Sequence, residues 1–318
     1  MDPLHATSTG RTDVTTLGES LASLHGQGPL RLGGTLGLSV AGAEASVAIG
    51  LARLGHAVRW AGVVGDDEFG RLVLRTLRAE GVDVSTARVH GERPTGLLVQ
   101  ESRVADITRV HYYRAGSAGA TLSAADATAA LAEQPRVLHI TGVTPALGAE
   151  PRAAMEHAVR LAKDAGVMVS LDVKHRSRLW DADTATSALS RLLPFVDVLI
   201  VSAGELPLVG GPEGVTGIAE VVVKHGADGA EAWRGAEHAR AAARRVPVAG
   251  TVGAGDAFTA GYLSGLLDGL PLPGRLARGV TLAAFAVASH SGRQGGWHGL
   301  PTRDELHLLD LPEGATVR

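Results

Sequence analysis

The sequence has 318 residues, of which 45% are hydrophobic and 20% charged, so it holds ample apolar material for a packed globular core. Its net charge of −3 disfavours nucleic acid or an anionic membrane surface as the main partner, and a small molecule is expected instead. The absence of cysteine excludes a disulfide framework and thiolate-bound zinc.

The first residues, MDPLHATSTGRTD, are polar and contain no apolar signal core. No apolar run approaches the roughly 20 residues that span a bilayer as a helix. We therefore expect a cytoplasmic protein without a membrane partner, in which residues 1–12 are flexible.

Along the chain, buried strand-like runs alternate with amphipathic helical patterns. Strands are predicted at 14–20, 58–65, 137–143, 167–173, 197–202 and 220–226, and helices at 44–55, 68–81, 124–134 and 151–166. This alternation predicts an α/β fold in three layers, with a mainly parallel central sheet flanked by helices. Such sheets bind ligands at the carboxyl ends of their strands.

Two segments, 28–40 and 95–114, interrupt this rhythm with short alternating runs that lack helical neighbours. They predict a small antiparallel sheet that stands off the main one as a lid, formed discontinuously by about 22–41 and 90–116 within a single domain of 1–318. Exposed sheet edges tend to be covered, so the lid also suggests a homodimer.

The stretch GTVGAGDAFTAGYLSGLL, residues 250–267, places three glycines and an acid immediately before a helical pattern. The N–H groups of Gly253, Ala254 and Gly255 would lie at the helix start, which favours an anion. A dinucleotide-binding turn is disfavoured, because only 63 residues (318 − 255) follow Gly255. No G-x-x-x-x-G-K-[ST] loop and no H-R-D catalytic loop is present.

These residues resemble the second signature of the ribokinase-like (pfkB-type) carbohydrate kinases, D-T-x-G-A-G-D-x-F. AGAEASVAIGLARLG with VVGDDEFG, and VVVKHGADGA, are similar to two further family elements, and the resemblance runs from about Val14 to Leu306. YYRAGSA, ITGVTPAL, LDVKHRSRLW and VDVLIVSAGE look most like the 2-keto-3-deoxygluconate kinases, which phosphorylate a sugar acid at its terminal hydroxyl.

The resemblance implies an ATP-dependent kinase with Asp256 as the general base that takes the proton of the acceptor hydroxyl. Gly253, Ala254 and Gly255 would form an anion hole for the transferred phosphoryl group. The structural alternative is that Asp256 only stabilises the helix dipole, which is worth roughly 0.3–1 kcal/mol.

Further site residues follow from the same resemblance. The expected substrate-binding residues are Glu19, Gly33, Gly34, Ser46, Tyr112, Arg114, Arg176 and Asp256. The expected ATP-binding residues are Ser202, Lys224, Gly226, Gly229, Gly253, Gly255, Thr281 and Ala284, and Glu205 would position Mg²⁺ through water. Arg114 and Arg176 would hold a carboxylate bidentately, the alternative being solvated or structural arginines. Gly33 and Gly34 would otherwise be ordinary hairpin glycines.

The sequence contains no asparagine, and its departures from the family pattern cluster where the family uses that residue. Ser46, Ser202 and Lys174 stand at such positions, and so does Thr281, near the expected adenine. A hydroxyl keeps a hydrogen-bonding oxygen but lacks the amide.

Two other departures concern catalysis and substrate: Gly250 replaces the acid that opens the second signature, and Leu98 replaces a lid aromatic. Three hypotheses therefore stay open. They are a kinase of a sugar or sugar acid, a catalytically weakened regulator that binds nucleotide or sugar, and a nucleoside kinase of the same fold.

Overall fold

The computed structural model describes residues 11–104, 107–289 and 297–311, and the side chains of these ranges except residues 27, 102–104 and 107–108. Arg11 and Thr12 are thus the described part of the segment 1–12, and the expectation of flexibility for residues 1–10 lies outside the described residues. In the described part of the chain, no helix is long and apolar enough to cross a bilayer.

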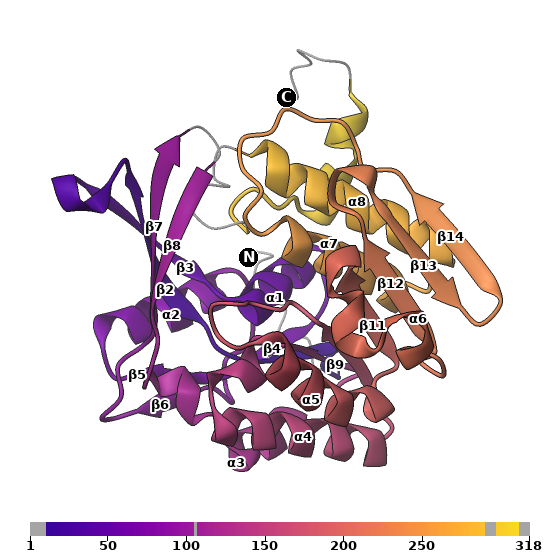
Figure 1. Cartoon of the computed structure of the whole chain (residues 1–318), viewed down its shortest axis with the longest axis horizontal. Coiled ribbons are helices and arrows are strands. Elements are labelled where there is room, and N and C mark those ends of the chain that lie inside the picture. The colour runs from indigo at the N-terminus through magenta and orange to yellow at the C-terminus, as the bar shows by residue number, and fades with distance from the viewer. Residues whose placement is uncertain (1–10, 105–106, 290–296, 312–318) are drawn as a thin grey trace, which may run out of the picture.

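The core of the molecule is an eight-stranded sheet in the order β14-β13-β12-β11-β10-β9-β1-β4 (Figure 1). Neighbouring strands from β12 to β4 pair in parallel, and β13 and β14 continue the sheet as an antiparallel hairpin. The strands are β1 Val14–Leu17, β4 Val58–Ala61, β9 Val137–Thr141, β10 Met168–Asp172, β11 Val198–Ser202, β12 Glu220–Lys224, β13 Ala230–Arg234 and β14 Glu237–Ala241.

Helices cover both faces of this sheet. Buried residues of α3, α4 and α5 pack against one face, and those of α1, α7 and α8 pack against the other. The helices are α1 Ala43–Arg53, α2 Glu68–Ala79, α3 Ala124–Leu131, α4 Ala149–Asp164, α5 Ala182–Leu192, α6 Gly211–Gly214, α7 Ala254–Leu267 and α8 Leu272–Ala288. The three-layer α/β prediction is confirmed.

A second, four-stranded sheet stands beside the main body (Figure 1). Its order is β3-β2-β7-β8, with β2 Leu21–Gln27, β3 Leu36–Ala41, β7 Leu97–Val104 and β8 Ile107–Tyr113. Each hairpin is antiparallel, as expected, but β2 and β7 join the two hairpins in parallel. The expected lid is therefore present as a sheet of mixed direction.

The predicted strand 58–65 is divided at Gly62. Its first half is β4 in the main sheet, and its second half, β5 Val63–Gly65, pairs with β6 Arg88–His90 in a separate two-stranded sheet. A side chain at Gly62 would lie 2.3 Å from the carbonyl oxygen of Gly18, so this close approach of two chain segments requires glycine.

A buried polar row crosses the main sheet on the face covered by α1 and α7. Thr16, His139 and Ser170 are register partners on β1, β9 and β10, and His139 Nδ1 lies 3.2 Å from Ser170 Oγ. Burial lowers the pKa of His139 to about 4, with Asp172 opposing that shift and Lys174 and Lys224 adding to it. The imidazole is therefore neutral near pH 7.

We expect this histidine to make the fold less stable in mild acid. Because its pKa is lower in the folded state than in the unfolded state, its contribution is complete above about pH 6.5 and is lost as the pH falls toward 4. Between pH 7 and pH 5 the wild type should lose about 2 kcal/mol more unfolding free energy than His139→Gln. Urea denaturation at the two pH values measures this, and equal losses in both proteins would contradict it.

Candidate active site

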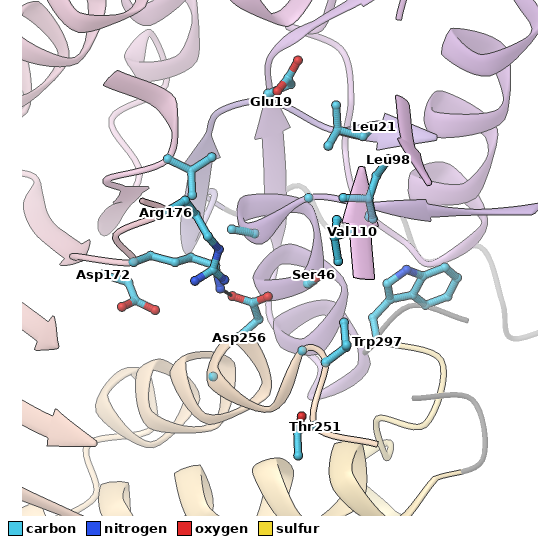
Figure 2. Close-up of a pocket in the computed structure, with 18 of the residues that line it drawn as sticks. Glu19, Leu21, Ser46, Leu98, Val110, Asp172, Arg176, Thr251, Asp256 and Trp297 are labelled. Carbon is cyan, nitrogen blue, oxygen red and sulfur yellow. Dashed lines mark hydrogen bonds and ion pairs between the residues drawn. The ribbon is translucent and has the colours of Figure 1, made fainter. Parts of the chain in front are cut away.

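The candidate site is a cavity of about 580 Å³ between the carboxyl ends of the central strands, the start of α7 and the underside of the small sheet (Figure 2). Leu21, Leu98 and Val110 line it from the small sheet, and Asp256 lies across the cavity from them at the start of α7. The other polar or expected residues in its lining are Glu19, Ser46, Gln100, Tyr112, Arg114, Asp172, Lys174, Arg176, Ser202, Glu205, Lys224, Gly226, Thr251, Gly253 and Gly255.

Helix α7 begins as the sequence predicts. Gly253 is its N-cap, with a left-handed φ of 83° that favours glycine, and Asp256 is the third residue after the cap. The first N–H groups of a helix have no partner within the helix, so that of Gly255 is available to an anion, whereas that of Ala254 makes a long bond of 3.4 Å to the Thr251 carbonyl oxygen. Asp256 is 7% exposed.

Lys174 donates to Asp256, a contact that the sequence analysis did not foresee. The ammonium group bonds Asp256 Oδ1, and both side chains are largely buried. Lys174 also has a left-handed φ of 41°. Burial acts to lower the pKa of Lys174, but the nearby Asp256 and Asp172 carboxylates outweigh it and raise that pKa. The lysine therefore carries a positive charge beside the expected base.

Lys224 and Asp172 form a second buried ion pair near the pair of Lys174 and Asp256. Lys224 Nζ lies 2.9 Å from both carboxylate oxygens of Asp172, and Thr259 Oγ1 donates to Asp172 Oδ2 at 3.3 Å. Burial raises the pKa of Asp172, but Lys224 and Lys174 more than offset this and hold it below its usual range. Lys224, expected at the nucleotide, is thus fixed by an acid that the sequence analysis did not assign.

Arg114 and Glu19, both expected to contact substrate, bond each other. Arg114 Nη2 donates to Glu19 Oε2, and Ser117 Oγ donates to Glu19 Oε1 at 2.6 Å. Arg114 also stacks over the Tyr112 ring, with its Cζ atom 5.4 Å from the ring centroid. Both members of the pair are more than nine-tenths buried. The charge of Arg114 is therefore already balanced before any ligand enters.

Arg176 differs from Arg114 because it is exposed and lines the cavity. Its Nη1 makes a long contact of 3.5 Å to the carbonyl oxygen of His175. Figure 2 shows its side chain extending toward Asp256. Arg176 therefore presents an accessible guanidinium to a bound ligand.

Glu205 is held at the end of β11 by a capping box. Its Oε2 accepts from the backbone N–H and the hydroxyl of Ser202 at 2.9 and 2.6 Å, and its Oε1 accepts from the His175 N–H at 2.7 Å. Within the described ranges, no cluster of three or more metal-ligating side chains exists. A hydrated Mg²⁺ that is bound mainly by phosphates needs one carboxylate or two from the protein, and Glu205 fits that role.

A neighbouring cavity of about 550 Å³ lies between the β13–β14 side of the sheet and α8. It shares Lys224, Gly226, Thr251 and Gly255 with the first cavity. Its other lining residues are mostly apolar: Ala227, Gly229, Ala243, Arg244, Arg245, Val246, Val248, Ala254, Phe258, Val280, Ala283, Ala284 and Val287. The two cavities therefore meet at the anion-binding start of α7.

Three expected residues lie outside both cavities. Gly33 and Gly34 are exposed beyond the 3₁₀ turn Leu30–Leu32 of the small sheet. The hydroxyl of Thr281 donates to the Ala277 carbonyl oxygen and accepts from Arg244 Nη1, so its hydrogen bonds are made within the protein. Ser46, Gly229 and Ala284 do lie in the linings.

Sequence reasoning missed Trp297, which lines the first cavity from the C-terminal segment (Figure 2). Its Nε1 donates to the Val40 carbonyl oxygen at 2.9 Å, and its ring stacks on His298. The signal for it was a lone tryptophan within the glycine-rich run GGWHG. Asp172 carried a comparable signal, an acid at the end of a buried strand.

A family model described as "pfkB family carbohydrate kinase" matches residues 11–298. The chain belongs to the pfkB family of carbohydrate kinases. It is therefore a sugar kinase. The crystal structure of a "putative Ribokinase II" from E. coli has a TM-score of 0.86 and 25% identity, over 94% of this chain and 99% of that one, so the expected ribokinase-like fold is confirmed.

Named relatives of this pfkB kinase act on different sugars. A 2-dehydro-3-deoxygluconokinase of Bacillus subtilis is 36% identical, with 93% of this chain and 94% of the relative covered. A fructokinase of Klebsiella pneumoniae is 34% identical, over 83% and 90%. The crystal structure of a PfkB protein from Polaromonas sp. JS666 has a TM-score of 0.82 and 37% identity, over 93% and 99%.

Proposed function

We propose that this pfkB kinase transfers the γ-phosphoryl group of ATP to the terminal hydroxyl of a sugar acid similar to 2-keto-3-deoxygluconate. The observation that carries the proposal is the position of Asp256, which lies within one helical turn of the α7 N–H groups and faces the cavity beneath the small sheet. A base, an anion site and an acceptor cavity therefore meet at one point.

In the proposed step, the acceptor oxygen attacks the γ-phosphorus of ATP while Asp256 takes the hydroxyl proton. The bond between the γ-phosphorus and its bridging oxygen breaks, and ADP leaves with that electron pair. The N–H groups of Gly253, Ala254 and Gly255 stabilise the negative charge on the transferred phosphoryl oxygens.

ATP would occupy the second cavity with its base among the apolar side chains of α8 and of the segment 243–248. Its phosphates would lie over Gly226 and the start of α7, the part of the lining that both cavities share. Mg²⁺, when bound, offsets phosphate charge, and Glu205 would hold it through a water molecule.

The small sheet would act as the lid of this site, because its inner face supplies Leu98 and Tyr112 to the cavity. A homodimer formed through the lid remains a prediction. The outer part of the lid exposes Leu32, Leu36 and Leu38 by 76%, 41% and 51%, and contact with a second copy would cover this apolar surface.

Turnover of a panel of sugar acids, neutral sugars and nucleosides with ATP and Mg²⁺ tests the proposal. A preference for the sugar acid supports it, and a preference for nucleosides would replace it by the nucleoside-kinase hypothesis. The bond between Lys174 and Asp256 favours one further candidate, a catalytically weakened member that binds nucleotide or sugar. Binding without turnover of any acceptor would support that candidate.

Substitution of Arg176 tests binding of the substrate carboxylate more directly than substitution of Arg114, because Arg114 is already paired with Glu19. Arg176→Gln should raise KM for 2-keto-3-deoxygluconate by roughly 10- to 150-fold, because a hydrogen bond to a charged group contributes about 1.5–3 kcal/mol to binding. KM for a neutral sugar should change little. Arg191→Gln, which removes an exposed arginine outside the cavity lining that pairs with Glu156, is the matched control. Equal losses for acid and neutral substrates would exclude carboxylate binding by Arg176.

A further inference from the structure

Lys174 stands where the family resemblance leads one to expect asparagine, and the structure places its charge at the expected base. It lies two residues beyond β10, its side chain is 12% exposed, and its ammonium group bonds Asp256 Oδ1. Its left-handed φ of 41° is costly for a long side chain and persists where the surroundings fix it. The lysine is therefore held in this position and is not a mobile surface cation.

The same position brings Lys174 to the phosphoryl site. Asp256 is the third residue of α7 after the Gly253 cap, so its backbone lies within one turn, about 5.4 Å of rise, of the N–H groups at the start of α7. An ammonium group on the Asp256 carboxylate is close to any anion held at those N–H groups. Lys174 also lines the cavity, and an ammonium group has three N–H donors, of which Asp256 Oδ1 accepts one.

Two other cations line the cavity: the exposed Arg176, proposed above to bind the acceptor's carboxylate, and Lys224, whose Nζ lies 3.7 Å from the place a Cβ on Gly255 would take. Lys224 has both oxygens of the buried Asp172 carboxylate as partners at 2.9 Å. Asp256 keeps its second oxygen, Oδ2, for the acceptor hydroxyl while Oδ1 accepts from Lys174. One carboxylate is thus able to hold the lysine and the acceptor at the same time.

We propose that Lys174 is a catalytic residue that donates to the transferred phosphoryl group and stabilises its charge in the transition state. This inference rests on the proposed function. Phosphoryl transfer depends mainly on positioning and on cations at the phosphoryl oxygens, and a protein cation placed there can raise turnover by orders of magnitude. Lys174 supplies such a charge where asparagine would supply a neutral amide.

The first test compares Lys174→Asn with Lys174→Arg. Asparagine tolerates a left-handed backbone better than most residues, so the variant should keep the fold while it loses the charge. Its kcat should fall roughly 10- to 150-fold with sugar KM nearly unchanged. Lys174→Arg should retain more activity. Lys163→Asn, which removes a half-exposed lysine 3.7 Å from Asp197, is the matched control and should leave turnover unchanged.

The second test needs no turnover. Calorimetry with Mg²⁺ compares the affinity for β,γ-imido-ATP with the affinity for ADP. Lys174→Asn should weaken binding of the imido analogue about tenfold or more while ADP binding changes little, because ADP lacks the γ-phosphate. Should Lys174→Asn fail to fold in thermal melts, Lys174→Met provides the same comparison.

Two results would overturn the inference. A higher kcat in Lys174→Asn would mean that the lysine blocks the base. If both kcat and the ratio of the affinities for β,γ-imido-ATP and ADP stay unchanged, Lys174 has only a structural role. If no acceptor is phosphorylated by the wild type, the proposed function fails. The affinity ratio then still decides whether Lys174 binds the γ-phosphate.

Discussion

Asp256→Asn is expected to lower turnover by roughly 10²- to 10⁴-fold, the usual effect of losing a general base. The amide has the same shape as the carboxylate, and its oxygen can still accept from Lys174. The N–H groups at the start of α7 also remain, so ATP should bind almost as well as to the wild type. Removing one partner of a largely buried ion pair should lower the unfolding free energy by at most about 3 kcal/mol, because Asp172 still attracts Lys174.

Asp268→Asn is the control for this variant, because it removes an acid at the other end of the same helix. Asp268 is the C-cap of α7 and pairs with Arg278 and Arg303, away from the cavity. It should lose stability with little loss of turnover. Phosphoryl-transfer rates together with thermal melts, with and without ATP, separate the two variants. An Asp256→Asn protein that folds and turns over near the wild-type rate would end the proposed mechanism and favour the helix-dipole alternative.

Arg275→Met is expected to lower the unfolding free energy by about 3–5 kcal/mol, because it leaves a buried carboxylate without its cation. Glu220 is 4% exposed where α7 and α8 pack on β12. Its two oxygens accept from Arg275 Nη1 and from the Tyr262 hydroxyl, each at 2.6 Å. Burial, together with the negative charge of Glu220, raises the pKa of Tyr262, so that hydroxyl stays protonated and donates.

The matched control is Arg71→Met, which breaks exposed pairs with Glu68 and Asp66 at 2.5 and 3.1 Å, away from Glu220. That variant should change stability much less than Arg275→Met does, because water screens an exposed pair. Urea denaturation measures both variants, and Arg275→Met with Glu220→Gln should recover part of the loss. Equal effects of the two arginine substitutions would show that burial of the Glu220 pair contributes nothing beyond an exposed pair.

Much of the fold followed from local patterns. The parallel strands and helices α1 to α4 were predicted because their apolar spacing records which face each element buries. Helix α8 and the β13–β14 hairpin were not predicted. Helix α8 begins in the proline- and glycine-rich run GLPLPGRLARG, which is typical of a loop. Strands β13 and β14 have exposed residues and few apolar ones, so no buried apolar run marks them in the sequence.

The sequence by itself determined the α/β layering, the lid segments and the position of Asp256 at a glycine-rich helix start, because each depends on neighbours within a few residues. Tertiary structure alone decided the charge pairing of the site. Lys174 with Asp256, Arg114 with Glu19 and Lys224 with Asp172 join residues 82, 95 and 52 positions apart. Opposite charges attract without regard to sequence order, so the choice of partner among 30 lysines and arginines and 33 acids depends on which side chains the packed strands bring within hydrogen-bonding distance.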